Sequence, residues 1–256
     1  MKIYGLQFDI AWENKEANRE RLRQLFKGQS FEKDSLVVLP EMTCTGFTQT
    51  VEGLAENSAG PTESFYARLA AEHNITLVGG VIQQAPTGKG RNVALALSPR
   101  GERITDYTKM HPFTFSGENN FFERGDKLST FSWQGLKVAP FICYDLRFPE
   151  IFRAVAGVEL YTVIANWPAP REKHWMTLLQ ARAIENQAYV IGINRCGTDP
   201  KVAYSGRSLI IDPQGVIVAD AGSGEGFIEA ELDIAELRAY RERFPALSDR
   251  RDFAAV

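Results

Sequence analysis

Strand-like and helix-like segments alternate along most of the chain, and this alternation limits the folds that it can adopt. Residues 35–39 form a continuous apolar run, which is typical of a strand buried on both faces. Residues 14–27 carry one apolar stripe among charges, as surface helices do. Two further strand–helix alternations are predicted over residues 148–194. The pattern therefore indicates an α/β protein.

Two predicted hairpins have related turns, which suggests that the chain contains two similar halves. Ser98-Pro99-Arg100-Gly101 joins the strands of the first hairpin, and Asp212-Pro213-Gln214-Gly215 joins those of the second. In both turns proline and glycine occupy positions that suit a tight reversal. If each half forms a sheet with helices on its outer side, the two sheets face one another. The sequence therefore predicts a four-layer α-β-β-α sandwich.

Local signals predict several other elements. Thr62 follows a proline and is a favoured N-cap residue for a helix that runs through Glu72. The segment 110–127 is rich in Gly, Asn and Phe and is predicted to be a loop. Helices are also expected at 148–156 and at 234–243.

The composition bounds the class of protein. With 256 residues, 44% of them hydrophobic and 24% charged, and no linker-like stretch, the chain is expected to form one domain over 1–256 with a charged tail from about residue 244. A net charge of −3 gives no reason to expect a nucleic-acid partner or an anionic membrane surface. No apolar run approaches the length of a membrane span, and the N-terminus resembles a first strand. Three widely spaced cysteines favour a reducing, cytoplasmic setting.

Three reactive side chains fall at the predicted carboxyl ends of strands: Glu41, Lys109 and Cys143. Ligands and chemistry in α/β proteins collect at such strand ends. A thiol nucleophile needs a base to take its proton, and a cation or N–H donors to hold the oxyanion that forms. Cys143 precedes a predicted helix start, so the turn can expose its sulfur. Each residue alone is compatible with a structural role, but the combination favours catalysis.

Three motifs carry a resemblance to a known family. Leu39-Pro40-Glu41-Met42, Tyr107-Thr108-Lys109-Met110-His111 and Ile142-Cys143-Tyr144-Asp145-Leu146-Arg147-Phe148-Pro149 resemble, in order, the catalytic motifs of the nitrilase superfamily of carbon–nitrogen hydrolases. The similarity continues through Ala165-Asn166-Trp167-Pro168 and residues 181–187, and it covers nearly the whole chain. The resemblance implies the same four-layer sandwich.

The resemblance also implies a catalytic set that needs neither metal nor cofactor. In this reading Glu41 is the general base and Cys143 is the nucleophile, which forms a thioester and releases ammonia. Lys109 and the backbone N–H of Tyr144 stabilise the oxyanion. Glu118, in the segment between the Lys and Cys motifs, is expected to be a fourth catalytic carboxylate that orients water.

The Cys motif most resembles that of bacterial ω-amidases, which hydrolyse short keto-acid monoamides such as 2-oxoglutaramate and 2-oxosuccinamate. The substrate is then a small-molecule amide whose carboxylate is held by Arg147, although a salt bridge at the helix start is an equal alternative for that residue. Trp167 with Phe113 or Phe115 is expected to form an apolar wall. The loop 168–173 is short and charged, which departs from the ω-amidase pattern. A difference in this loop can change which substrate the protein accepts.

Other functions remain open at this stage. An N-carbamoyl amino acid amidohydrolase or a nitrilase would use the same triad. A metal-dependent phosphoesterase could share the sandwich, but His73, His111 and His174 are isolated in the sequence, and the acidic metal-binding runs are missing. A non-catalytic binding protein would be expected to lose part of the triad.

The superfamily resemblance further implies a homodimer or a larger homo-oligomer. Cys44 and Cys196 are expected to be structural, and His174 to pack near the site.

Overall fold

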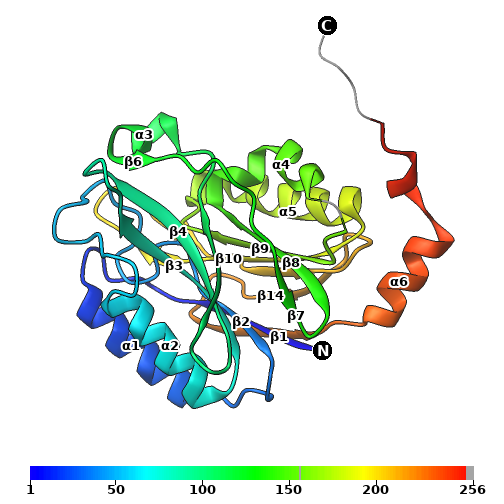
Figure 1. Cartoon of the computed structure of the whole chain (residues 1–256), viewed down its shortest axis with the longest axis horizontal. Helices are drawn as coiled ribbons and strands as arrows, with labels where there is room; N and C mark the ends of the chain where they lie inside the picture. The colour runs from blue at the N-terminus through cyan, green and yellow to red at the C-terminus, as the bar shows by residue number, and fades with distance from the viewer. Residues whose placement is uncertain (156, 252–256) are drawn as a thin grey trace, which may run out of the picture.

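The computed structural model describes residues 1–155 and 157–251, and it has the predicted four-layer α-β-β-α arrangement (Figure 1). Two sheets pack face to face in the middle of the molecule. Helices α1 (Lys15–Lys27) and α2 (Pro61–His73) cover the outer side of one sheet. Helices α4 (Pro149–Ala154) and α5 (Glu172–Asn186) cover the other.

Each half of the described chain contributes one sheet. In spatial order the first sheet contains β15 (Gly226–Glu231), β1 (Lys2–Gln7), β2 (Leu36–Val38), β3 (Thr76–Gln84), β4 (Gly90–Leu97) and β5 (Arg103–Thr108), with β6 (Phe122–Glu123) also paired to β4. The second contains β14 (Ile217–Asp220), β13 (Leu209–Ile211), β10 (Tyr189–Asn194), β9 (Leu160–Ala165), β8 (Leu136–Ile142) and β7 (Phe131–Trp133). The last strand β15 returns to the first sheet, so the two ends of the fold are tied together.

The core lies between the sheets and follows the two-residue period of a strand. In β2, Leu36 and Val38 point into the core between the sheets, whereas Val37 packs toward the helices. The sheets pack closely at Gly5 of β1, where an added Cβ would lie 2.1 Å from the Cδ1 atom of Ile193. Only a residue without a side chain leaves room for Ile193 at this crossing.

The predicted cap of α2 is wrong. The helix begins at Pro61, and its N-cap is Gly60, two residues before the predicted cap. The backbone N–H and the hydroxyl of Thr62 instead donate to the buried carboxylate of Glu56, at 2.7 and 2.8 Å. Thr62 therefore binds the loop before the helix, because the carboxylate of Glu56, six residues earlier, accepts from both of its donors. The surface helix predicted over residues 14–27 does form, and the Asn14 side chain caps it by accepting from the N–H of Ala17.

The segment 110–127 was predicted to be a loop, and this is only partly right. It contains a 3₁₀ turn, η1 (Thr114–Ser116), then the short helix α3 (Glu118–Phe121), then β6. A second short hairpin that the sequence did not predict, β11 (Cys196–Thr198) with β12 (Ala203–Ser205), follows β10. These elements have two to four residues each, too few for a periodic pattern.

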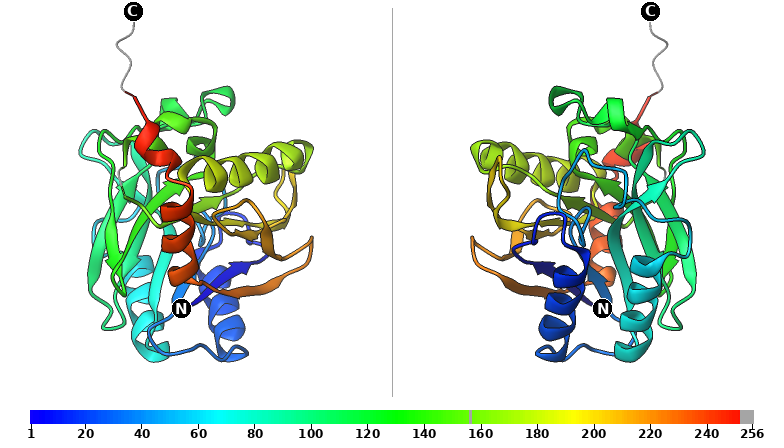
Figure 2. Two further views of the ribbon diagram at one scale, coloured as in Figure 1. Left: turned by 90° about the vertical axis from the view of Figure 1, so that its right-hand side faces the viewer. Right: turned by 90° about the vertical axis from the view of Figure 1, so that its left-hand side faces the viewer.

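Helix α6 (Ile234–Arg243) has the predicted bounds. It lies beside the four layers in Figure 1 and faces the viewer in the left view of Figure 2. The guanidinium of Arg241 donates to the carbonyls of Gln187 at 2.8 Å and Val158 at 2.6 Å. A short turn, η4 (Ala246–Asp249), follows within the predicted tail. Residues 252–256 of that tail, and residue 156 of the helix predicted at 148–156, lie outside the described residues.

We expect Gly80 to be needed for the position of the Glu41 backbone. A Cβ on Gly80 would lie 2.3 Å from the nitrogen of Met42 and 2.7 Å from the carbonyl carbon of Glu41. Because these are backbone atoms, Gly80→Ala must displace the chain, and we expect it to lower the free energy of unfolding by about 1–3 kcal/mol in urea titrations. Gly28→Ala is the matched control, since the nearest atom to its Cβ would be 3.5 Å away. Equal stability of the two variants would contradict the prediction.

Candidate active site

A buried lysine between two buried carboxylates lies at the centre of the site. Lys109 directly follows β5, and its Nζ lies 3.0 Å from Oε1 of Glu41 and 2.8 Å from Oε2 of Glu118. The three residues are at most 1% exposed. Burial alone would lower the pKa of Lys109, but the charges of Glu118 and Glu41 outweigh burial and raise the pKa above its ordinary value. The lysine is therefore held as a cation.

Two asparagines, neither of them predicted as site residues, fix the carboxylates. The Asn92 side chain donates to Oε1 of Glu41 at 2.7 Å and to Oε1 of Glu118 at 3.1 Å. The backbone N–H of Asn166 donates to Oε2 of Glu41 at 2.8 Å, and its side chain donates to the Glu41 carbonyl at 2.7 Å. Asn166 ends a strand inside one of the similar segments, but nothing local in the sequence marks Asn92.

Cys143 lies on a sharp turn between β8 and the 3₁₀ helix η2 (Cys143–Arg147), as predicted, although η2 separates it from α4. Its φ is +48°, a left-handed conformation that costs a residue with a side chain about 1–3 kcal/mol. Its sulfur faces the Asn166 carbonyl at 4.0 Å. Asn166 thus contacts the sulfur through its carbonyl and Glu41 through its N–H.

The environment of Cys143 favours the neutral thiol. Burial, followed by the negative charge of Glu41, raises the pKa of Cys143 well above its ordinary value, and the positive charge of Lys109 only partly offsets these effects. The residue is 8% exposed. A nucleophile at this position therefore needs a base that removes its proton as it attacks.

Asp145 connects the cysteine turn to the chain around Lys109. Its buried carboxylate accepts from the Tyr107 hydroxyl at 2.8 Å, from the His111 N–H at 3.0 Å and from the Ile142 N–H at 3.1 Å. The His111 ring also contacts it, through Nδ1 at 2.8 Å. Asp145 lies within the motif around Cys143, but the sequence predicts no role for it. It fixes the two segments relative to each other.

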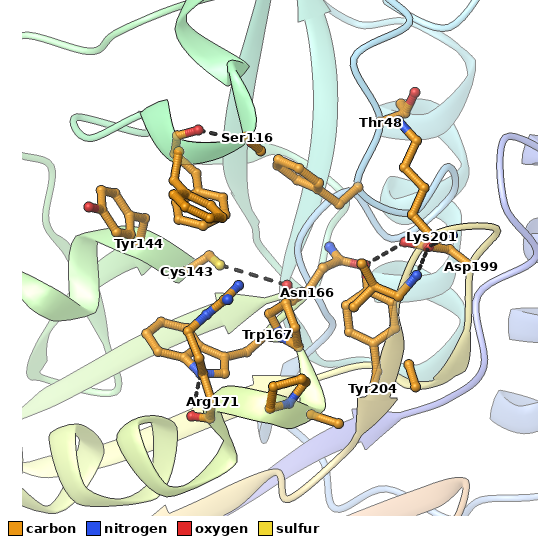
Figure 3. A pocket seen from close by; sticks show the side chains of 18 of the residues that line it. Thr48, Ser116, Cys143, Tyr144, Asn166, Trp167, Arg171, Asp199, Lys201 and Tyr204 are labelled. Carbon is orange, nitrogen blue, oxygen red and sulfur yellow. Dashed lines mark hydrogen bonds between the residues drawn. The ribbon is translucent and has the colours of Figure 1, made fainter.

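A pocket of about 820 Å³ opens onto the sulfur (Figure 3). Its lining includes every residue that the sequence predicted for the substrate, and three further cationic or acidic residues that it did not: Phe113, Phe115, Tyr144, Arg147, Trp167, Arg171, Asp199 and Lys201. The Arg147 guanidinium lies 4.9 Å from the Trp167 ring, and its Nη2 lies 3.2 Å from Nδ1 of His174. His174 therefore does pack beside the site. Tyr144 is the second residue of η2, where a helix leaves its N–H groups free to bind.

Cys44, Cys196 and His73 do not line this pocket. Burial raises the pKa of Cys44 to about 12 and that of Cys196 to about 11. Within residues 1–155 and 157–251, no three His, Cys, Asp or Glu side chains are grouped so that they could hold a metal ion. In the same part of the chain, no helix is both long and apolar enough to span a membrane.

A sequence profile described as carbon–nitrogen hydrolase matches residues 5–242. The chain belongs to the carbon–nitrogen hydrolase family. Among curated family members it is 39% identical to the omega-amidase YafV of Yersinia enterocolitica, over 99% of this chain and 98% of that one. It is 34% identical to a 2-oxoglutaramate amidase of Bacillus subtilis, over 97% of both chains. The CN-hydrolase superfamily protein XC1258 of Xanthomonas campestris has a similar structure, with a TM-score of 0.94, 31% identity and coverage of 100% and 99%.

We expect the alkylation of Cys143 by iodoacetamide to accelerate steadily from about pH 6 to about pH 9, without a plateau near neutrality. A raised pKa means that the thiolate forms only above the ordinary cysteine value of about 8.5. Glu41→Gln removes a neighbouring negative charge and should move the curve to lower pH. Cys143→Ala is the control and should remain unlabelled, because Cys44 and Cys196 are buried and, unlike Cys143, do not line the pocket. A wild-type plateau near pH 7 would contradict the raised pKa.

Asp145→Asn should destabilise the cysteine turn. An amide nitrogen would face one of the N–H or O–H donors that the carboxylate now accepts, and each buried donor left without an acceptor costs about 1–3 kcal/mol. We expect a lower free energy of unfolding in urea titrations. Asp106→Asn is the matched control, because the Asp106 side chain is 47% exposed. Equal effects of the two substitutions would show that Asp145 does not connect the segments.

Proposed function

We propose that this protein is an ω-amidase-type amidohydrolase that releases ammonia from the terminal amide of short 2-oxo acid monoamides, such as 2-oxoglutaramate and 2-oxosuccinamate. The observation that carries the proposal is the guanidinium of Arg147. It lines the pocket together with Cys143, and within the described part of the chain it forms no ion pair with a carboxylate. A substrate carboxylate can fill that place. The relatives named omega-amidase and 2-oxoglutaramate amidase support the substrate class.

The first half of the proposed reaction forms a thioester. Glu41 takes the proton of Cys143 as the sulfur attacks the amide carbon. The oxyanion is stabilised by the positive charge of Lys109 and by the backbone N–H of Tyr144. When the carbon–nitrogen bond breaks, Glu41 returns the proton to the departing nitrogen, and ammonia leaves. The resting contacts support this order, because the sulfur faces the Asn166 carbonyl while Asn166 also holds Glu41.

The second half of the reaction hydrolyses the thioester. Water, oriented by Glu118, loses a proton to Glu41 and attacks the acyl carbon. The carbon–sulfur bond then breaks, the sulfur of Cys143 regains a proton from Glu41, and the 2-oxo acid leaves. All of these roles fall on side chains and one backbone N–H of this chain, so the proposed cycle uses no metal or cofactor.

The proposal includes the setting in which the enzyme works. We place all 256 residues in one domain and the protein in the cytoplasm, supported by three cysteines that are free and buried. A homodimer or larger homo-oligomer follows from the resemblance to the superfamily. The substrate is a small molecule, and neither a nucleic acid nor a membrane is a partner.

An ammonia-release panel tests the activity. We expect wild-type protein to hydrolyse 2-oxoglutaramate and 2-oxosuccinamate, and Cys143→Ala to lower the rate at least about 1,000-fold because the nucleophile is lost. Arg147→Met should raise KM for both substrates more than it lowers kcat, since it removes a contact to the substrate carboxylate. Turnover of only an N-carbamoyl amino acid or an aliphatic nitrile, the two alternatives that share the triad, would overturn the proposed substrate.

A further inference from the structure

The pocket holds more positive charge than one carboxylate substrate requires. Arg147, Arg171 and Lys201 all line it, against one lining carboxylate, that of Asp199. Asp199 is already occupied, because it accepts from the Tyr204 hydroxyl at 2.6 Å and from the N–H groups of Lys201 and Val202 at 2.7 Å each. The cationic side chains of the pocket are therefore left to bind a ligand.

Arg171 has no carboxylate partner in the described part of the chain. Two other half-buried arginines do have one: Arg207 pairs with Asp220 at 2.6 Å, and Arg103 pairs with Glu63. The guanidinium of Arg171 instead lies 5.4 Å from the centre of the Phe113 ring. Such a stack uses the face of the guanidinium and leaves the N–H groups at its edge available to an acceptor.

The backbone holds Arg171 in this place. It is the last residue of the 3₁₀ turn η3 (Ala169–Arg171), and its carbonyl accepts from Nε1 of Trp167 at 2.8 Å. Phe113, which the guanidinium covers, packs 4.9 Å from the Tyr144 ring, and Tyr144 follows the nucleophile directly. Figure 3 shows Arg171 on the same side of the pocket as Cys143 and Trp167, away from Asp199 and Lys201.

Two guanidinium groups without carboxylates in a pocket with aromatic walls repel each other, so the pocket is suited to a ligand with two separate acceptors. In the proposed function Arg147 takes the substrate carboxylate, and Lys109 with the Tyr144 N–H takes the amide oxygen. The remaining acceptor of a 2-oxo acid monoamide is then its 2-oxo oxygen. We propose that Arg171 is a second substrate-binding guanidinium that donates hydrogen bonds to this 2-oxo oxygen. The site then distinguishes a 2-oxo acid monoamide from the same amide without the oxo group. This inference rests on the proposed function.

The test compares two substrates that differ only in that oxygen: 2-oxoglutaramate and the monoamide of glutaric acid. Arg171→Met keeps an unbranched apolar side chain but removes the donors. We expect it to lower kcat/KM for 2-oxoglutaramate by about 10- to 100-fold, the size expected for a lost charge-assisted hydrogen bond. For glutaric monoamide the loss should stay below about threefold. Arg147→Met should lower kcat/KM for both substrates, because both carry the carboxylate.

Arg68→Met is the matched control, because it removes one positive charge from an exposed position of α2 outside the pocket. It should leave kcat/KM unchanged for both substrates. If Arg171→Met lowers kcat/KM equally for the two substrates, the inference is overturned. Arg171 would then bind the carboxylate that both substrates share, or maintain the conformation of its loop. No loss on either would also overturn it. Wild-type turnover of both monoamides at equal kcat/KM would overturn it while leaving the amidase proposal intact. Wild-type inactivity on both would overturn the amidase proposal and this inference with it.

A binding measurement keeps the inference testable if the variant turns over poorly. We expect calorimetric titration to show that Arg171→Met weakens binding of 2-oxoglutarate about 10-fold or more and that of glutarate less than about threefold. Arg171→Lys, which keeps the charge but lacks the planar fork, should fall between wild type and Arg171→Met. Equal weakening of the two acids by Arg171→Met would contradict the assignment, and thermal unfolding of each variant establishes that it is folded.

Discussion

The ion cluster around Lys109 is the interaction on which the rest of the site depends. Two buried carboxylates this close together would strongly repel each other if no cation lay between them. The Lys109 ammonium bridges Glu41 and Glu118, and the Asn92 amide supplies a second bridge from the neighbouring strand. Both carboxylates are held by donors in fixed positions, and their geometry does not rely on solvent.

The proposed catalytic residues and Asn166, which binds one of them, are divided between the two sheets. Glu41 and Lys109 follow strands of the first sheet, whereas Cys143 and Asn166 follow strands of the second. Long-range hydrogen bonds connect residues of the two sheets. One of them joins Asn166 to Glu41, which are 125 residues apart. The proposed base and nucleophile therefore come together only when both halves of the fold are complete.

The sequence predicted the architecture and the polar residues that follow strands, because both depend on local patterns. Strand–helix alternation and the paired hairpin turns indicated two facing sheets, and the short motifs around Glu41, Lys109 and Cys143 identified the ends of their strands. Asn92 and Arg171 were missed for a physical reason. The role of Asn92 is set by a carboxylate 51 positions away, and that of Arg171 by an aromatic ring on another segment. The error at Thr62 has a local origin, since the carboxylate of Glu56, six residues earlier, binds the donors of Thr62.

The close approach of the sheets at Gly5 has a consequence for the alignment of the site. Residues along a strand are about 3.3 Å apart, so a slip of one sheet by a single residue would separate groups that now lie within a hydrogen bond of each other. Ile193 fills the space that a side chain at position 5 would take, which fits one sheet against the other in a single register. Gly5 thus serves as an alignment point for chemistry to which it contributes no functional group.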